Sequence, residues 1–254
     1  MSPLPQLTRV HTRRLREIYR SAGWPCQDLV EVELLAAGLL ERHTNNSGHT
    51  WLRVSDAGLQ QLALTLAQNR AVRSDHEALV DIVAREMARA GRIAWRGLSL
   101  RTQIPAPTDP GSGEGEPASR WVMAQPDVFS IRQTSVEAYA EPLVHEIKVR
   151  RADLLSDLRQ PGKRAAYLSL GGACWYVLGL DRQGRNIGTA DDVPPECGVL
   201  LLQQNRSEQR PEHRLEVARP APQRRVERLP FSLWMALAKA TPAAAADDEA
   251  QGRL

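Results

Sequence analysis

The spacing of apolar and polar positions divides the chain into a mainly helical N-terminal part and a C-terminal part in which strands and helices alternate. Apolar side chains recur at helical spacing over Val10 to Ser21 and over Gln27 to Glu41. A polar, turn-rich segment at 43–49 and an alternating, strand-like stretch from Trp51 to Val54 follow. A helical pattern then returns from Leu59 to Asn69. Residues 1–73 are therefore expected to form a small domain of their own.

The order of these elements is two helices, a polar loop, a strand and a further helix, which is the order of a winged helix. The string from Glu33 to Glu41, the polar loop and the string from Leu52 to Leu59 resemble the end of many bacterial winged-helix domains. The resemblance implies that the loop is the wing and that Ser-Asp-Ala-Gly-Leu at 55–59 opens the last helix. A winged helix-turn-helix is thus expected over residues 1–73.

A second domain is expected over residues 75–240, opening with an amphipathic helix from Glu77 that Gly91 ends. A helix in two parts, interrupted at Pro161-Gly162, is expected over Ala152 to Leu170. Strand-like patterns occur at Ile93–Ile104, Arg120–Ile131, Pro142–Val149, Ala173–Leu180 and Gly198–Gln203, with an edge strand at Arg214–Ala218 and a closing helix at Pro230–Lys239. Composition indicates a mobile loop at 105–119 and a disordered tail at 241–254.

The alternation of helices and strands predicts an α/β fold with a mixed sheet and flanking helices. No glycine-rich loop follows the first strand, which argues against a doubly wound nucleotide-binding fold. With 42% hydrophobic and 25% charged residues, the composition is that of a globular protein, and a net charge of +3 is compatible with a polyanionic partner. The cysteines Cys26, Cys174 and Cys197 form no metal motif or disulfide framework, which favours the cytoplasm. The absence of a long apolar stretch predicts no membrane partner.

Charged residues end two of the strand-like runs. Asp127 follows Pro126, and Glu146-Ile147-Lys148 comes nineteen residues after Asp127. Charged groups rarely interrupt buried strands unless they are paired or bind a metal. Alternation places Glu146 and Lys148 on the same face of their strand. Two alternative interpretations remain. Asp127 would be a turn residue after Pro126, and Glu146 and Lys148 would lie on the solvated face of an edge strand.

Lysine is rare in this chain: of the 33 lysine and arginine residues, only three are lysine. A lysine within a Glu-x-Lys string is therefore less easily explained by chance. Two carboxylates on adjacent strand ends can supply oxygen ligands to Mg²⁺ or Mn²⁺, and a lysine beside them can orient water or neutralise phosphate charge. The backbone carbonyl of Ile147 would face such a metal. Glu77 on the preceding helix is the expected third acid, with Glu86 as the alternative.

The order helix with Glu, strand, Pro-Asp, Glu-Ile-Lys, helix and apolar strand resembles the PD-(D/E)XK nuclease superfamily over residues 75–180, particularly its resolvase-like and repair-associated members. The resemblance implies a restriction-endonuclease-like αβββαβ core in which Asp127 and Glu146 bind the metal, Lys148 is the catalytic lysine and Glu77 is the helix acid. The stretch from Arg151 onward resembles the helix after the motif, whose charged residues and Tyr face the site. Candidate nucleic-acid contacts on it are Lys163, Arg164 and Tyr167.

These patterns predict a nuclease that uses Mg²⁺ or Mn²⁺ to hydrolyse DNA phosphodiester bonds, in repair or defence. The winged helix would assist contact with DNA or a protein partner, with Arg13, Arg14 and Arg53 as candidate phosphate contacts. Two alternatives stay open: a DNA-binding regulator or adaptor with a catalytically silent scaffold, and an interaction module that is active only with its partner. The resemblance also suggests a homodimer. His145 is expected in the core, facing away from Glu146, and His76 on the surface.

Overall fold

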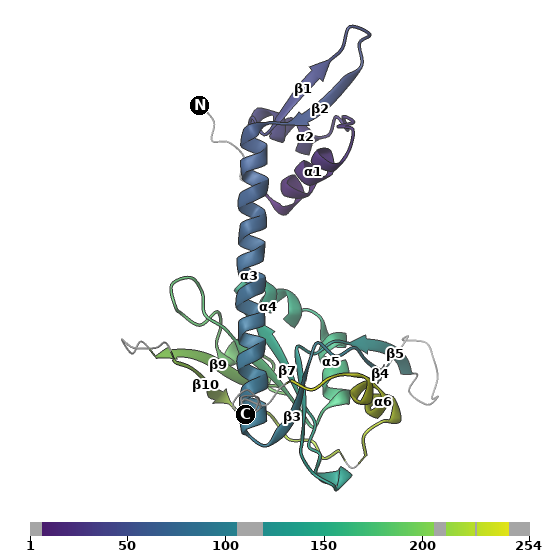
Figure 1. The fold of residues 1–254 in the computed structure, drawn as a ribbon, viewed down its shortest axis with the longest axis vertical. Helices are drawn as coiled ribbons and strands as arrows, with labels where there is room; N and C mark the ends of the chain where they lie inside the picture. Colours follow the sequence, from purple (N-terminus) through teal and green to yellow (C-terminus); the bar gives the residue numbers. More distant parts are fainter. Residues whose placement is uncertain (1–6, 106–118, 206–211, 227, 244–254) are drawn as a thin grey trace, which may run out of the picture. The chain divides into compact units, whose positions relative to one another are not determined.

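The computed structural model describes residues 7–105, 119–205, 212–226 and 228–243 (Figure 1). The chain separates into two compact units, Met1–Ser74 and Asp75–Leu254. Helix α3 (Asp56–Arg89) runs across the boundary as one 34-residue helix, so the prediction of two separate helices was wrong. The polar stretch 69–75 interrupts the apolar pattern, but it contains no Gly or Pro, and nothing there breaks the helical backbone.

The N-terminal unit contains α1 (Arg9–Arg20), α2 (Leu29–Ala36), the hairpin of β1 (Leu40–Thr44) and β2 (Thr50–Val54), and the start of α3. A hydrophobic core that includes Leu15, Leu34 and Leu52 holds these elements together. The second helix ends earlier than predicted, because Gly38 takes a left-handed φ of 68° and Leu40 then pairs with Val54. The strand β1 was therefore missed by the sequence pattern.

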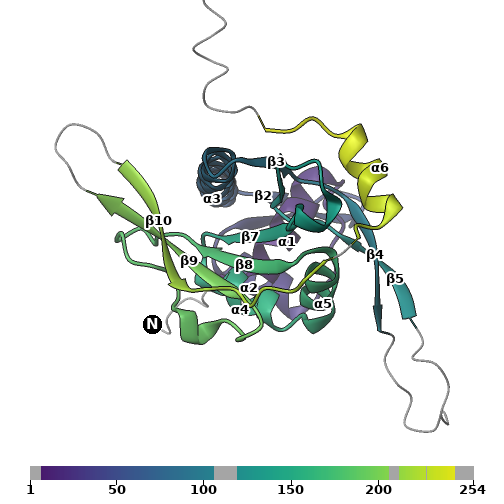
Figure 2. The ribbon, with the colours of Figure 1, turned by 90° about the horizontal axis from the view of Figure 1, so that it is seen from below.

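A mixed six-stranded sheet is the centre of the C-terminal unit, which confirms the predicted α/β class (Figure 2). Its strand order is β10-β9-β8-β7-β6-β3, in which β3, β6 and β7 are antiparallel neighbours and β8 and β9 run parallel to β7. The antiparallel β10 is the edge strand that the sequence predicted. The strand bounds are β3 (Arg92–Arg96), β6 (Val128–Arg132), β7 (Leu143–Lys148), β8 (Ala173–Leu178), β9 (Gly198–Asn205) and β10 (Glu212–Arg219).

A separate two-stranded hairpin consists of β4 (Leu100–Pro105) and β5 (Ser119–Ala124). The sequence predicted that each of these strands continued into the main sheet. Instead, the first run breaks at Gly97, whose φ is 59°, and the second breaks at Pro126, which cannot donate a ladder hydrogen bond. The Gly97 amide donates to the carbonyl of Asp127 at 3.1 Å, so the two breaks lie together. The predicted mobile loop lies, at 106–118, outside the described residues.

Helices cover both faces of the main sheet. On one face, α3 contributes Val83 to a core with Val128, Ile147 and Val177. On the other face, a larger core joins the sheet to helices α4 (Arg151–Leu158), α5 (Pro161–Leu170) and α6 (Phe231–Lys239). The predicted break at Pro161 is confirmed, because Pro161 begins α5. No helix in the described part of the chain is long and apolar enough to cross a membrane.

The end of the chain is described only as far as Ala243, whose amide donates to the carbonyl of Ala94 in β3 at 2.7 Å. The rest of the predicted disordered tail, 244–254, lies outside the described residues.

His145 is a core residue of β7, 1% exposed. Alternation places it on the opposite face of the strand from Glu146. Its Nδ1 atom is buried and has no hydrogen-bond partner among the described residues. Burial, together with the charge of Arg92, lowers the pKa of His145 to about 3. The folded protein therefore holds a neutral imidazole at a pH where an unfolded chain would bind a proton.

We expect this histidine to make stability depend on pH. Its pKa is depressed on folding, so its contribution is complete above about pH 6.5 and is lost as the pH falls toward the folded value, by up to about 1.4 kcal/mol per pH unit. Urea unfolding between about pH 7 and pH 4.5 should show a flatter pH dependence for His145→Leu than for the wild type. The exposed His213 on β10 provides the control His213→Gln, whose profile should match that of the wild type. Equal slopes for the wild type and His145→Leu would contradict the assignment.

Candidate active site at the end of β7

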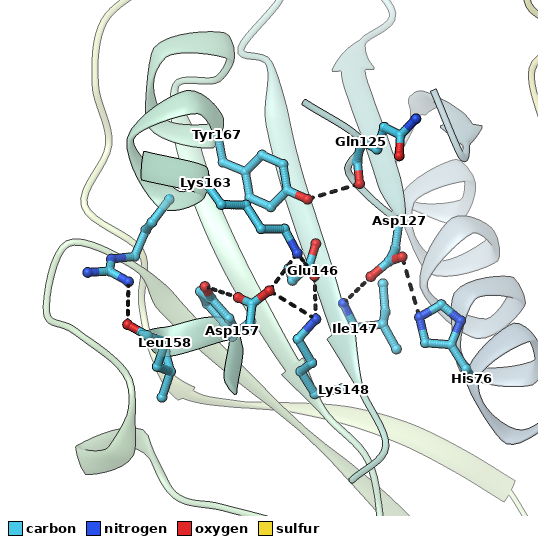
Figure 3. A network of polar contacts seen from close by, with 12 residues as sticks. His76, Gln125, Asp127, Glu146, Ile147, Lys148, Asp157, Leu158, Lys163 and Tyr167 are labelled. Carbon is cyan, nitrogen blue, oxygen red and sulfur yellow. Dashed lines mark hydrogen bonds and ion pairs between the residues drawn. The ribbon is translucent and has the colours of Figure 1, made fainter. Parts of the chain in front are cut away.

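The structure brings Asp127, Glu146 and Lys148 into one network of polar contacts (Figure 3). Asp127 lies just before β6, the Glu-Ile-Lys string ends β7, and the two strands pair with Val128 opposite His145. The Asp127 Oδ2 atom accepts a hydrogen bond of 2.7 Å from the amide of Ile147, the residue between Glu146 and Lys148. Strand pairing thus places one carboxylate against the backbone of the string that carries the other.

Glu146 is a nearly fully buried carboxylate, 2% exposed. Its Oε1 atom accepts hydrogen bonds from the ammonium groups of Lys148 and Lys163, the second at 2.6 Å. Its Oε2 atom is buried without a hydrogen-bond partner among the described residues. Because a buried carboxylate oxygen normally has a partner, Oε2 is an atom that a bound group could satisfy.

Asp157, at the end of α4, is a second buried carboxylate, which the sequence did not single out as a site residue. Its Oδ1 atom lies 2.5 Å from Nζ of Lys163 and 3.4 Å from Nζ of Lys148. Its Oδ2 atom accepts a hydrogen bond of 2.7 Å from the Tyr176 hydroxyl. Burial by itself would raise the pKa of Asp157, but the two ammonium groups and the hydroxyl outweigh it, and the pKa is lowered.

Lys163 belongs to the network, whereas Arg164 does not. Burial alone would lower the pKa of Lys163, yet Glu146 and Asp157 outweigh it and raise that pKa. The neighbouring Arg164 instead donates through Nε to Oε1 of Glu196 at 2.9 Å and through Nη1 to the Leu158 carbonyl. Arg164, a predicted nucleic-acid contact, is therefore already engaged in an ion pair with Glu196.

Tyr167 is fully buried, and its hydroxyl donates to the carbonyl of Gln125 at 2.9 Å. Burial raises its pKa, so the hydroxyl stays protonated. The Lys163 ammonium lies 5.4 Å from the centre of the Tyr167 ring. Tyr167 thus links α5 to the segment before Asp127 and supports the network from one side.

The helix residue that faces Asp127 is His76, not the predicted Glu77. His76 Nε2 lies 3.3 Å from Asp127 Oδ1, and Asp127 raises the pKa of His76 against the opposing effect of burial. The Glu77 side chain is 60% exposed, and its Oε1 atom lies 3.8 Å from Nδ1 of His76. Consecutive residues of an α-helix point in directions about 100° apart. The spacing of charged residues in the sequence did not show which of the two, His76 or Glu77, faces Asp127. The alternative acid, Glu86, pairs with Arg89 at 2.7 Å.

The three candidate arginines of the N-terminal unit differ in their surroundings. Arg14 donates to Asp28 Oδ2 at 2.6 Å, and Asp28 caps the first turn of α2, so this arginine has a structural partner. Arg13 is exposed and pairs with Glu17 at 2.9 Å. Arg53 is exposed on β2 of the hairpin. Exposure therefore favours Arg13 and Arg53 as candidate phosphate contacts, and Arg14 less.

The described residues contain no group of three or more His, Cys, Asp and Glu side chains placed to hold a metal. The carboxylates of Asp127 and Glu146 supply oxygen atoms, the ligand type that a hard cation takes. Mg²⁺ in enzymes often uses only one or two carboxylates and takes its other ligands from water and substrate phosphate. The unpartnered Oε2 of Glu146 and the partly exposed carboxylate of Asp127, 21% exposed, are suitable ligands of this kind.

Comparisons of the chain with protein-family models, with curated protein sequences and with solved structures gave no match.

We expect Asp157 to hold the network together. Replacing it by alanine would leave Lys148 and Lys163 with Glu146 as their remaining carboxylate and the Tyr176 hydroxyl without its acceptor. Removing one partner of a buried ion pair costs about 3–5 kcal/mol. Asp157→Ala should therefore lower the unfolding free energy of the C-terminal unit by roughly this amount in urea titrations. Ser156→Ala, at an exposed position on the same helix, is the control and should change it by less than about 0.5 kcal/mol. A loss for Asp157→Ala no larger than that of the control would show that the contacts contribute little.

Proposed function

We propose that the C-terminal unit hydrolyses phosphodiester bonds of DNA with the help of a bound Mg²⁺ or Mn²⁺ ion. The observation that carries this proposal is the position of Asp127. Its carboxylate accepts a hydrogen bond from the backbone amide of Ile147, the residue that separates Glu146 and Lys148 in the sequence. Two carboxylates and a lysine at adjacent strand ends are the groups needed to place a cation and a phosphate together.

The element order around the site supports the same proposal. A helix, α3, precedes three consecutive antiparallel neighbours in the sheet, β3, β6 and β7. Two helices, α4 and α5, then lead to β8, which is parallel to β7. Apart from the inserted β4–β5 hairpin, this order supports the αβββαβ core that the resemblance to the PD-(D/E)XK nucleases implies. Asp127 lies immediately before the second strand of that order, and Glu146 and Lys148 lie on the third.

Each side chain has a distinct task in this proposal. Asp127 and Glu146 would hold the cation, which, when bound, polarises a phosphoryl oxygen and lowers the pKa of water. Lys148 would neutralise negative charge that develops on the phosphate. Its ammonium now pairs with Glu146 and Asp157, so an approaching phosphate would compete with these carboxylates for it. His76 would keep the Asp127 carboxylate oriented from the helix side.

The N-terminal unit would contribute contact with DNA or with a partner protein. Its β1–β2 hairpin presents Arg53 together with Trp51, whose ring stacks on His43 with centroids 5.5 Å apart. Exposed arginines and an aromatic ring on a hairpin suit contact with phosphates and sugars in the manner of a wing. The acidic residues of α2, among them Glu33, make that helix unsuitable for insertion into a groove.

Cleavage assays test the proposal. Full-length protein with Mn²⁺ should cleave labelled single-stranded, duplex or branched DNA, and Asp127→Asn, Glu146→Gln and Lys148→Met should each reduce the rate at least about 100-fold. Asp191→Asn removes an exposed carboxylate of the same unit and should leave the rate unchanged. Circular dichroism melting would show that each variant is folded. Cleavage that persists in all three site variants would refute the proposed function.

A second candidate function, a DNA-binding regulator or adaptor with a silent scaffold, is favoured by one specific observation. Both lysines, Lys148 and Lys163, already neutralise Glu146 and Asp157, so the network is electrostatically satisfied except at the Oε2 atom of Glu146. A purely structural ion network would have the same contacts.

Metal titration separates the two functions. If the site is catalytic, calorimetry with MnCl₂ should show binding that both Asp127→Asn and Glu146→Gln weaken by about tenfold or more. Asp191→Asn should bind Mn²⁺ as the wild type does. Binding that is absent, or that does not depend on these two carboxylates, would favour the scaffold.

A further inference from the structure

A cavity of about 590 Å³ lies beside the candidate active site, between α5 and the β4–β5 hairpin. Lys163 and Tyr167 are part of its lining, so it adjoins the polar network at the end of β7. Figure 2 shows the hairpin running beside α5. The volume falls within the range of about 300–1,000 Å³ that is usual for pockets that receive small molecules.

The charge of the cavity is positive. Among the residues that the structure describes, its lining contains two cationic side chains, Arg120 and Lys163, and no carboxylate. Glu146 and Asp157 already neutralise Lys163. Arg120 is exposed, and none of the ion pairs between described residues involves it. A methyl group on Gly162 would lie 3.6 Å from Arg120 Nη2, which places this guanidinium over the first turn of α5. Within the described lining, Arg120 is therefore the cation that is available for an anionic ligand.

The remaining walls of the cavity are apolar with a few amides. Val122 is a partly exposed apolar residue of the lining, Ile104 and the Tyr167 ring lie buried behind it, and Gln125 and Gln160 add amide groups. A nucleobase presents an apolar face and a polar edge, and the phosphate attached to it carries a negative charge. This combination of apolar wall, amides and one available guanidinium matches a nucleotide better than it matches a purely apolar ligand or an isolated phosphate.

We propose that this cavity receives one unpaired nucleotide of the DNA strand, with its phosphate on Arg120 and its base against Val122. The inference rests on the proposed nuclease function and deepens it, because it names the substrate class as DNA with a single-stranded segment at the site. A base inside a duplex is stacked and paired, and it enters a pocket only after leaving the stack. Single-stranded DNA avoids that cost.

The hairpin offers a matched pair of arginines for the test. Thr102 and Ile104, on the same face of β4, are buried, whereas Arg101 points away from α5 and lies 4.6 Å above the ring of Trp121. Arg120→Ala and Arg101→Ala therefore remove the same charge from opposite faces of one hairpin. Val122→Trp fills the cavity without changing the charge.

The measurement is fluorescence anisotropy of the full-length protein with a labelled single-stranded oligonucleotide and with the corresponding duplex, in EDTA so that no cleavage occurs. Arg120→Ala should weaken single-strand binding about tenfold, the usual loss of one hydrogen bond to a charged group, and lower the salt slope by about one. Val122→Trp should weaken it also. Arg101→Ala should change it less than about twofold. Duplex binding should change little in all three variants, and melting curves would show that they are folded.

Several results would overturn the inference: no single-strand binding by the wild type, unchanged binding by Arg120→Ala, an equal loss in Arg101→Ala, or an equal loss of duplex binding. The experiments can refute the cavity assignment and the nuclease proposal independently of each other. Binding that depends on Arg120 in a protein that cuts nothing with Mn²⁺ would refute the nuclease and leave the cavity assignment standing. If cleavage depends on the carboxylates but single-strand binding is unchanged in Arg120→Ala and Val122→Trp, only the cavity assignment is refuted.

Discussion

The buried ion network of Glu146, Asp157, Lys148 and Lys163 is the interaction on which the C-terminal unit depends. Two carboxylates lie inside the protein, 2% and 6% exposed, where an isolated charge would be strongly unfavourable. They are tolerated because two ammonium groups and the Tyr176 hydroxyl are within reach. The network joins β7 to α4 and α5, so packing and charge neutralisation act on the same elements.

This network also leaves part of its carboxylate surface without a protein partner among the described residues. The lysines neutralise one oxygen each of Glu146 and Asp157 and leave Glu146 Oε2 without a partner among the described residues. Asp127 is held apart from the lysines by the Ile147 amide and by His76. One edge of the cluster is therefore saturated with hydrogen bonds, while the other edge keeps carboxylate oxygens that a cation could use.

Much of the local structure followed from residue types along the chain. The start of α5 at Pro161, the edge position of β10 and the core location of His145 all match what spacing and breakers predicted. The errors have physical reasons. The long α3 was divided in two because its polar stretch hid an uninterrupted helical backbone. Two runs were read as single strands because a bend at Gly97 and at Pro126 redirects the chain without changing its apolar pattern.

The candidate site shows the same division. The sequence by itself determined Asp127, Glu146 and Lys148, because charged residues at strand ends and period-two alternation can be recognised along one strand. Only the tertiary structure decided that His76 rather than Glu77 faces Asp127, that Asp157 joins the network and that Arg164 turns to Glu196. These choices depend on the rotation of helices against the sheet. Helix rotation is set by packing between residues distant in sequence, which a local pattern does not contain.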